Sequence, residues 1–281
     1  MTTQETRKRG EELNQLSRLM FDRAAILWAS SIGLEALAGV SGIVVGLFVL
    51  SPNWKAGVAI IVAGIVAVAY ALRIRFANDY DDAETMRRQS VLAEALGWPI
   101  GSTEFSHWRQ KAGRNILDTF KVKTRDEDYY ATEHPEGPKR LLEMTIESAF
   151  FTRHVYAKAQ RFLWILCAVI AVLFVLILSI APLDNISSAT RLEVIYLLYL
   201  ALPLLISLDL LGWALRLGRL VQSLKYIEQD MERFEQEENP ALERVMRLVS
   251  EYNCQVVAGF PVLNFIFRYW HDEIRDLWNL R

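Results

Sequence analysis

The sequence lacks the residue patterns that mark most catalytic and metal sites. Its four histidines, His107, His134, His154 and His271, stand in separate segments without metal-ligand spacing. It contains no zinc-protease helix, no phosphate-binding loop and no dinucleotide fingerprint. We therefore expect no enzyme activity, no cofactor and no bound metal.

Cysteine and net charge are also scarce. The two cysteines, Cys167 and Cys254, are too few for a disulfide framework, and we interpret both as packing thiols. The 31 basic and 33 acidic residues leave a net charge of -2. Proteins that bind nucleic-acid polymers usually carry a basic excess, so we do not expect such a partner. Residues 1–13 mix charges of both signs, so we expect neither a cleavable signal peptide nor a lipidation motif there.

The sequence does have a long apolar run, Phe162–Ile180, with 19 residues and no charge. As a helix this run would extend roughly 28 Å, about the thickness of the hydrocarbon core of a bilayer. A buried helix of a soluble domain would normally show a polar stripe over such a length. We therefore predict that this run spans a membrane.

Three further apolar runs predict three more spans. Ile32–Leu50 is followed by a tight turn and then by the uncharged run Ala56–Leu72. A fourth run, Leu192–Leu215, is interrupted by Pro203, which should kink its helix. The predicted fold class is therefore all-α and polytopic, with four transmembrane helices in two hairpins at residues 32–72 and 161–215.

Polar segments flank the two predicted hairpins. Residues 1–31 place Leu13, Leu16 and Met20 on one face of an amphipathic helix, which would either lie at the cytosolic interface of the membrane or pack against other helices. Residues 73–160 have the composition of a soluble helical insertion, and residues 216–281 form a helical C-terminal region.

Within the insertion, turn and capping residues predict the helix ends. We expect one helix over residues 79–96, ended by Gly97, and a shorter one over residues 106–120. The next stretch has no apolar periodicity and is expected to be a loop. From Pro138 the chain has no helix breaker before the predicted span at Phe162, which predicts a single long helix.

Two spacing patterns predict helix packing. Small residues recur at helical spacing in the first hairpin, where they would let helix backbones approach closely, either within the chain or between protomers. These residues are Ala38, Gly42 and Gly46, followed by Ala59, Ala63 and Ala67. After the fourth run, apolar residues alternate between steps of three and four, which is a coiled-coil seam that would close on a helix of the same chain or of a second copy. The seam consists of Leu217, Leu220, Leu224, Ile227, Met231 and Phe234.

The distribution of basic residues predicts the orientation in the membrane. Arginine and lysine are frequent in residues 1–31, at both ends of the insertion and after residue 215, whereas the two short connecting loops hold only Lys55 and Arg191. The positive-inside rule therefore places both termini and the insertion in the cytosol.

Two acidic residues fall inside the predicted spans. Glu35 begins the first span and Asp209 lies near the end of the fourth, so both belong to the cytosolic half of the membrane. A carboxylate in lipid is unfavourable and usually faces protein or water. The two acids either line the inner mouth of an oligomeric, cation-selective pore or pair with nearby arginines such as Arg23, Arg73 and Arg216.

Several stretches of this sequence resemble a known family. They are DYYAT, GPKRLLEMTIESAFFT and the ending EYNCQVVAGFPVLNFIFRYWHDEIRDLW. Together with the order of hairpin, insertion, hairpin and tail, they resemble the SMODS-associated four-transmembrane effector family over nearly the whole chain. The resemblance implies a bacterial inner-membrane effector of anti-phage defence that acts beside enzymes making nucleotide second messengers.

The resemblance implies a homo-oligomeric, regulated pore that a cyclic oligonucleotide opens from the cytosol. A phosphate-bearing ligand would require arginines, lysines and helix amino termini. The insertion offers Arg109, Lys111, Arg114, Lys121, Lys123, Lys139 and Arg140, which are equally suited to anionic lipid. Two other functions fit the same layout: a constitutive ion channel of bestrophin-like layout, and a non-conducting membrane scaffold that recruits a partner through the seam.

Overall fold

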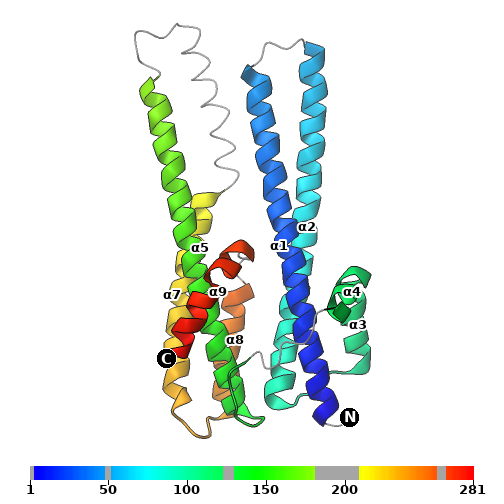
Figure 1. Cartoon of the computed structure of the whole chain (residues 1–281), viewed down its shortest axis with the longest axis vertical. Coiled ribbons are helices and arrows are strands. Elements are labelled where there is room, and N and C mark those ends of the chain that lie inside the picture. The colour runs from blue at the N-terminus through cyan, green and yellow to red at the C-terminus, as the bar shows by residue number, and fades with distance from the viewer. Residues whose placement is uncertain (1–2, 48–51, 123–129, 181–208, 258–263) are drawn as a thin grey trace. The chain divides into compact units, whose positions relative to one another are not determined.

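The computed structural model describes residues 3–47, 52–122, 130–180, 209–257 and 264–281, and these residues form helices and connecting turns without strands. The helices are labelled in Figure 1. In chain order they are α1 (Thr3–Leu47), α2 (Pro52–Leu96), α3 (Ser102–Ala112), α4 (Arg114–Val122), α5 (Pro138–Ile180), α7 (Leu210–Glu235), α8 (Leu242–Val257) and α9 (Asn264–Asn279). The expected all-α class is therefore confirmed.

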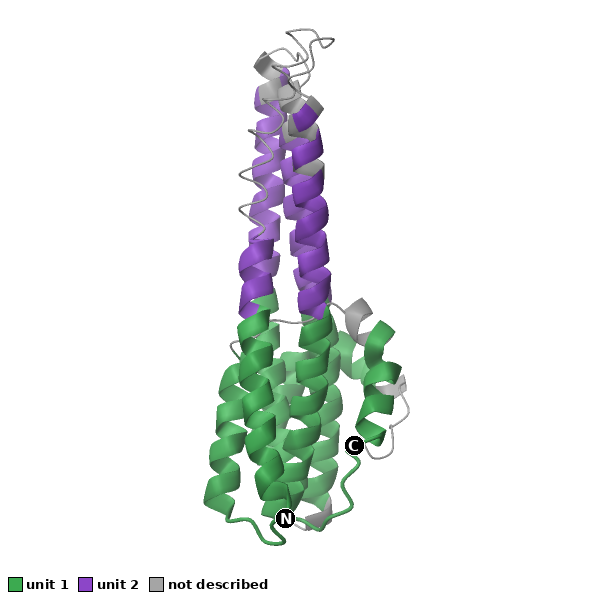
Figure 2. Cartoon of the chain, turned by 90° about the vertical axis from the view of Figure 1, so that its left-hand side faces the viewer, with its two compact units in different colours: residues 1–25, 76–158, 217–281 green, residues 26–75, 159–216 purple. Residues whose placement is uncertain are grey.

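The chain divides into two compact units, coloured separately in Figure 2. Unit 1 consists of residues 1–25, 76–158 and 217–281, and unit 2 of residues 26–75 and 159–216. The helices α1, α2 and α5 each contribute residues to both units without a helix break.

The core of unit 1 forms where the amphipathic face of α1 meets α2, α3 and α4. Leu13, Leu16 and Met20 are completely buried in one cluster with Met86 of α2 and Trp108 of α3, so the predicted amphipathic face packs against other helices. Burial of each large apolar side chain contributes roughly 1.5–3 kcal/mol, so this cluster is a main source of stability. A second cluster joins α9 to α5 through Phe150, Val155 and Ile274.

Glycines explain two helix ends in unit 1. Gly97 ends α2, as predicted, with a φ of 67° that a residue with a side chain rarely adopts. Gly113 has a φ of 80° and separates α3 from α4. The single helix predicted over residues 106–120 is therefore wrong, because this glycine turns the chain between two shorter helices.

The start of α5 lies beside the end of α2. The backbone amide of Gly137 donates a hydrogen bond to the carbonyl of Ala95 over 2.7 Å. The helix then begins at Pro138 and runs to Ile180, which confirms the predicted single long helix.

Unit 2 contains the apolar parts of the long helices. Among the described residues, three helices are long and apolar enough to cross a membrane, over Glu5–Gly42, Ala56–Leu96 and Pro138–Val172. Large apolar side chains such as Ile60, Ile61 and Val172 are exposed on them, as expected for surfaces that contact lipid. Most of the predicted fourth span, residues 192–208, lies outside the described residues.

Candidate functional site

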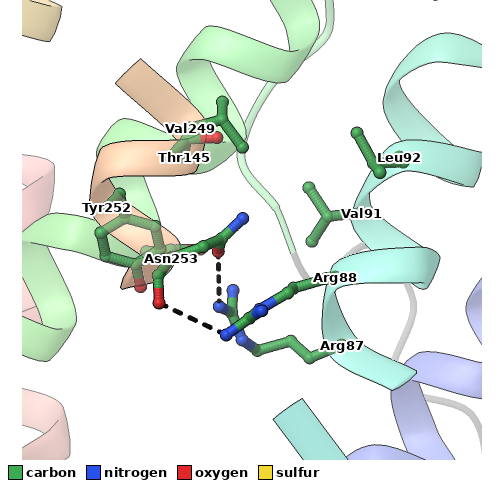
Figure 3. Close-up of a pocket in the computed structure, with 9 residues that line it drawn as sticks. Arg87, Arg88, Val91, Leu92, Thr145, Val249, Tyr252 and Asn253 are labelled. Carbon is green, nitrogen blue, oxygen red and sulfur yellow. Dashed lines mark hydrogen bonds between the residues drawn. The ribbon is translucent and has the colours of Figure 1, made fainter. Parts of the chain in front are cut away.

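A polar pocket in unit 1 brings three helices together (Figure 3). Arg87 and Arg88 reach it from α2, Thr145 and Ser148 from α5, and Asn253 from α8. Its remaining lining residues are Val91, Leu92, Val249 and Tyr252. The pocket therefore combines cationic, hydroxyl and amide groups on an apolar base.

An ion pair on α2 fixes the first arginine. Arg87 binds the Glu84 carboxylate through two hydrogen bonds of 2.7 and 2.9 Å, in the bidentate arrangement that gives the strongest pairs. The Glu84 side chain is only 3% exposed. Burial alone would raise the pKa of this carboxyl group, but the charges of Arg87 and Arg88 and the hydrogen bond from Arg87 lower it below its ordinary value. Glu84 is therefore ionised.

Both arginines also bind α8. A terminal nitrogen of Arg87 donates to the side-chain oxygen of Asn253 over 3.1 Å, and one of Arg88 donates to its backbone carbonyl over 3.3 Å, as drawn in Figure 3. The guanidinium of Arg87 also lies 5.5 Å from the ring centroid of Tyr252, within range of a cation–π interaction. Two adjacent residues of α2 thus hold the end of α8.

Buried tyrosines extend this polar network. The hydroxyls of Thr152 and Tyr252 are 3.2 Å apart, which links α5 to α8. Tyr80 of α2 and Tyr156 of α5 share a hydrogen bond, and burial raises the pKa of both phenols above the ordinary value. Both phenols therefore remain protonated and neutral.

The pocket is narrow. Its cavity volume is about 10 Å³, which is room for about one water molecule. The free space widens to about 280 Å³ when the solvent at its mouth is included. A nucleotide does not fit inside the cavity in this conformation, although one oxygen atom of a larger group does.

The residues of this pocket were not among the predicted ligand-binding residues. In the sequence, Glu84, Arg87 and Arg88 have the spacing of an ordinary ion pair on an exposed helix face. Their burial depends on α5 and α8, which are distant in the chain. The one available signal was the pair of adjacent arginines in a stretch that also contains the apolar residues Met86 and Val91.

Four of the predicted basic residues lie in described parts of the chain with partners of their own. On α3, Lys111 pairs with Asp82 at 2.6 Å and Arg109 lies 3.8 Å from Glu12. At the start of α5, Lys139 donates to the backbone carbonyls of Glu235 and Glu237, and Arg140 donates to the carbonyl of His134.

The other three predicted basic residues are Arg114, Lys121 and Lys123. Arg114 is exposed, the side chain of Lys121 is not among those described, and Lys123 lies outside the described residues. A ligand role for the seven stays a prediction.

Both acids of the predicted spans have arginine partners. Glu35 accepts a hydrogen bond of 2.9 Å from Arg73 within unit 2, with the two side chains 20% and 42% exposed. Asp209 pairs with Arg216, and it has a φ of 43°, a backbone conformation that aspartate tolerates better than most residues. The structure thus pairs both acids with arginines named as alternatives, and their role in a pore stays a prediction.

The predicted small-residue positions differ in exposure. Ala38 is buried, whereas Gly42, Ala59, Ala63 and Ala67 are exposed in the single chain, and the surroundings of Gly46 are not described. Their role in packing between helices or protomers stays a prediction.

The seam is mostly buried within the chain. Leu217, Leu220, Leu224 and Met231 are each at most 7% exposed, while Ile227 and Phe234 are half-buried. Beside the seam, Arg153 of α5 donates to the buried carboxylate of Glu228 over 2.5 Å. The seam therefore packs against helices of its own chain, and its contact with a second copy stays a prediction.

No metal-binding group appears in the part of the chain that the structure describes, where histidine, cysteine, aspartate and glutamate side chains form no cluster of three or more. The Nδ1 of His154 donates a hydrogen bond to the Phe150 carbonyl over 2.8 Å, and His134 lies 3.1 Å from Glu143. These histidines have local partners in unit 1.

Comparisons with known proteins identify no relative of this chain. No family model, no curated protein and no solved structure matches it.

Proposed function

We propose that this chain is a regulated pore-forming or membrane-disrupting effector of bacterial anti-phage defence. It is inserted in the inner membrane as a homo-oligomer, with both termini in the cytosol, and a cyclic nucleotide messenger activates it from that side. The sequence stretches that resemble the SMODS-associated four-transmembrane family supply the messenger and the defence role.

The continuity of three helices is the observation that carries this proposal. The apolar parts of α1, α2 and α5 continue as unbroken helices into the polar residues of unit 1. Packed helices transmit displacement because they move as rigid elements. A ligand that changes the packing of unit 1 can therefore change the positions of the membrane helices.

The polar interior of a sensor needs groups that can exchange hydrogen-bond partners. In unit 1 the contacts of Arg87 and Arg88 join α2 to α8 through hydrogen bonds of 3.1 and 3.3 Å, which are long for charged donors. Gating requires that the messenger bind the open arrangement more tightly than the closed one. These longer contacts are suited to be broken in that change.

Leakage from liposomes tests the proposal. The purified full-length protein is reconstituted with an encapsulated dye, and cyclic di- and trinucleotides are added one by one. We expect release only with one class of messenger. Failure of every nucleotide to release dye from correctly inserted protein would contradict the proposed function.

The same assay separates the other two candidates. Equal leakage with and without nucleotide would indicate the constitutive channel, because that function needs no messenger. Nucleotide binding without any leakage would indicate the scaffold.

Ion preference tests the role of the acids. If Asp209 lines the path, Asp209→Asn reduces cation preference, because a ring of carboxylates attracts cations. Glu243→Gln is the matched control, since Glu243 is an exposed acid at the start of α8 in unit 1. Unchanged preference in Asp209→Asn would leave its pairing with Arg216 as its role.

A further inference from the structure

The pocket of unit 1 presents hydrogen-bond donors that the chain leaves unused. The buried Nε of Arg88 has no hydrogen-bond partner. Beside it, the hydroxyl of Ser148 and the amide nitrogen of Asn253 donate no hydrogen bond to the described residues. A buried donor normally has a partner, so the Nε of Arg88 indicates a missing acceptor, and the half-buried Ser148 and Asn253 offer further donors beside it.

The local charge specifies what kind of acceptor is missing. Two guanidinium groups, Arg87 and Arg88, share one carboxylate, that of Glu84. Arg87 takes both carboxylate oxygens at hydrogen-bonding distance, whereas Arg88 is 3.8 Å away. The pocket therefore has an excess of one positive charge, which lies on Arg88.

The size of the pocket limits how the acceptor binds. The cavity of about 10 Å³ admits one oxygen-sized atom, and the rest of a larger group would lie in the open mouth. The arginine fork and hydroxyl donors match the oxygens of a tetrahedral oxyanion.

We propose that the pocket between α2, α5 and α8 is a binding site for a phosphoryl group, with one oxygen bound by Arg88, Ser148 and Asn253. The anion competes for Arg88 with the backbone carbonyl of Asn253, to which Arg88 donates a hydrogen bond of 3.3 Å. The site requires neither a pore nor a nucleotide messenger, so it goes beyond the proposed function.

Equilibrium dialysis of the full-length protein in detergent, with radiolabelled inorganic phosphate at constant ionic strength, tests the site directly. We expect saturable binding that chloride at the same concentration does not displace. Absence of saturable binding, or displacement by chloride alone, would overturn the assignment.

Variants then locate the bound anion. Arg88→Gln should weaken phosphate binding by roughly tenfold or more, because it removes a charged donor. Arg247→Gln is the matched control: Arg247 lies on α8, is 79% exposed and pairs with Glu251. Equal binding by the two variants would place the phosphate elsewhere and overturn the proposal.

Ser148→Ala provides a second variant in case Arg88→Gln fails to fold. It removes one hydroxyl that makes no hydrogen bond to the described residues, so it should weaken phosphate binding while leaving the unfolding temperature unchanged. Unchanged phosphate affinity in Ser148→Ala and in a folded Arg88→Lys variant would also overturn the site.

Competition identifies the source of the phosphoryl group. Displacement of phosphate by cyclic dinucleotides supports the site and indicates a soluble messenger, whereas displacement by glycerol 3-phosphate supports it and indicates a lipid headgroup. If the protein binds phosphate but no nucleotide causes dye to leak from the liposomes, the result contradicts only the proposed pore function.

Discussion

Most charged side chains in the described parts of the two units are paired, and the exceptions identify where the chain can respond to its surroundings. Pairs such as Arg23–Asp79 and Arg153–Glu228 join helices through short hydrogen bonds. Glu94 of α2 differs, because one of its buried oxygens has no hydrogen-bond partner. It lies close to Gly10 of α1, whose missing side chain leaves room for it.

The surroundings of Glu94 favour its neutral form. Burial, and after it the charge of Glu11, raise the pKa of this carboxyl group to about 7, although the charges of Arg140, Arg18 and Arg7 oppose the shift. Because the pKa of Glu94 is higher in the folded chain than its ordinary value of 4.5, protonation of Glu94 favours folding. This contribution to stability is fully present below pH 4.5 and is lost as the pH rises through about 7.

We therefore predict that Glu94→Gln stabilises the chain at about pH 8, by at least about 1 kcal/mol, and has little effect at about pH 5. Thermal unfolding of the purified protein at both pH values measures this difference. Glu251→Gln, which alters an exposed ion pair on α8, is the control and should show no such pH dependence. An identical shift at both pH values would contradict the prediction.

At the scale of helices, α7 stabilises unit 1 through its apolar seam. Leu224 is completely buried, and none of its surface contacts solvent. A carboxylate at this position would be buried without a partner.

We predict that Leu224→Asp lowers the stability of the chain by several kcal/mol. The control Tyr226→Asp changes a residue of the same helix that is 58% exposed, so it should shift the unfolding temperature little. Crosslinking of the two variants tests oligomerisation separately. Unchanged unfolding of Leu224→Asp would contradict the packing described for α7.

The C-terminal helix α9 binds α5 through one buried face. Ile274 is completely buried against Phe150 and Val155. The ammonium of Lys158 lies 3.7 Å from the ring centroid of Trp270 and 2.7 Å from the Glu273 carboxylate. Apolar burial and a cation–π contact therefore act together at this interface.

We predict that Ile274→Ala weakens this interface by about 2–5 kcal/mol, because it leaves a cavity. Hydrogen exchange of the full-length protein should then become faster in α9 while α3 retains its rate. Leu277→Ala is the control, since Leu277 lies on α9 and is 42% exposed. Equal exchange in the two variants would show that α9 is held by other contacts.

Local sequence signals predicted the helix ends better than the sites. Gly97 and Pro138 act through their own backbone preferences, so the end of α2 and the start of α5 were predictable. Gly113 was missed because a glycine inside a helical pattern is often tolerated. Arg87, Arg88 and Asn253 meet only after α2 and α8 pack, and no local pattern records that contact.

For the whole molecule, the division into a polar and an apolar unit predicts its topology. The apolar surfaces of unit 2 suit lipid, whereas unit 1 contains most of the paired charges and the polar pocket. The basic residues that precede and follow the predicted spans favour a cytosolic location for unit 1.

A native cysteine reports this topology. Cys254 is exposed on α8 in unit 1, and Cys167 is half-buried in the apolar part of α5. In a Cys167→Ser background we predict that Cys254 is shielded from a membrane-impermeant thiol reagent added to intact cells, and that it reacts once the cells are permeabilised. In the Cys167→Ser, Cys254→Ser background, Asn53→Cys should react from outside because it lies between the first two predicted spans. Reaction of Cys254 in intact cells, together with protection of Asn53→Cys, would mean that the chain is inserted the other way, since a reagent that cannot cross the bilayer reaches only the outer face.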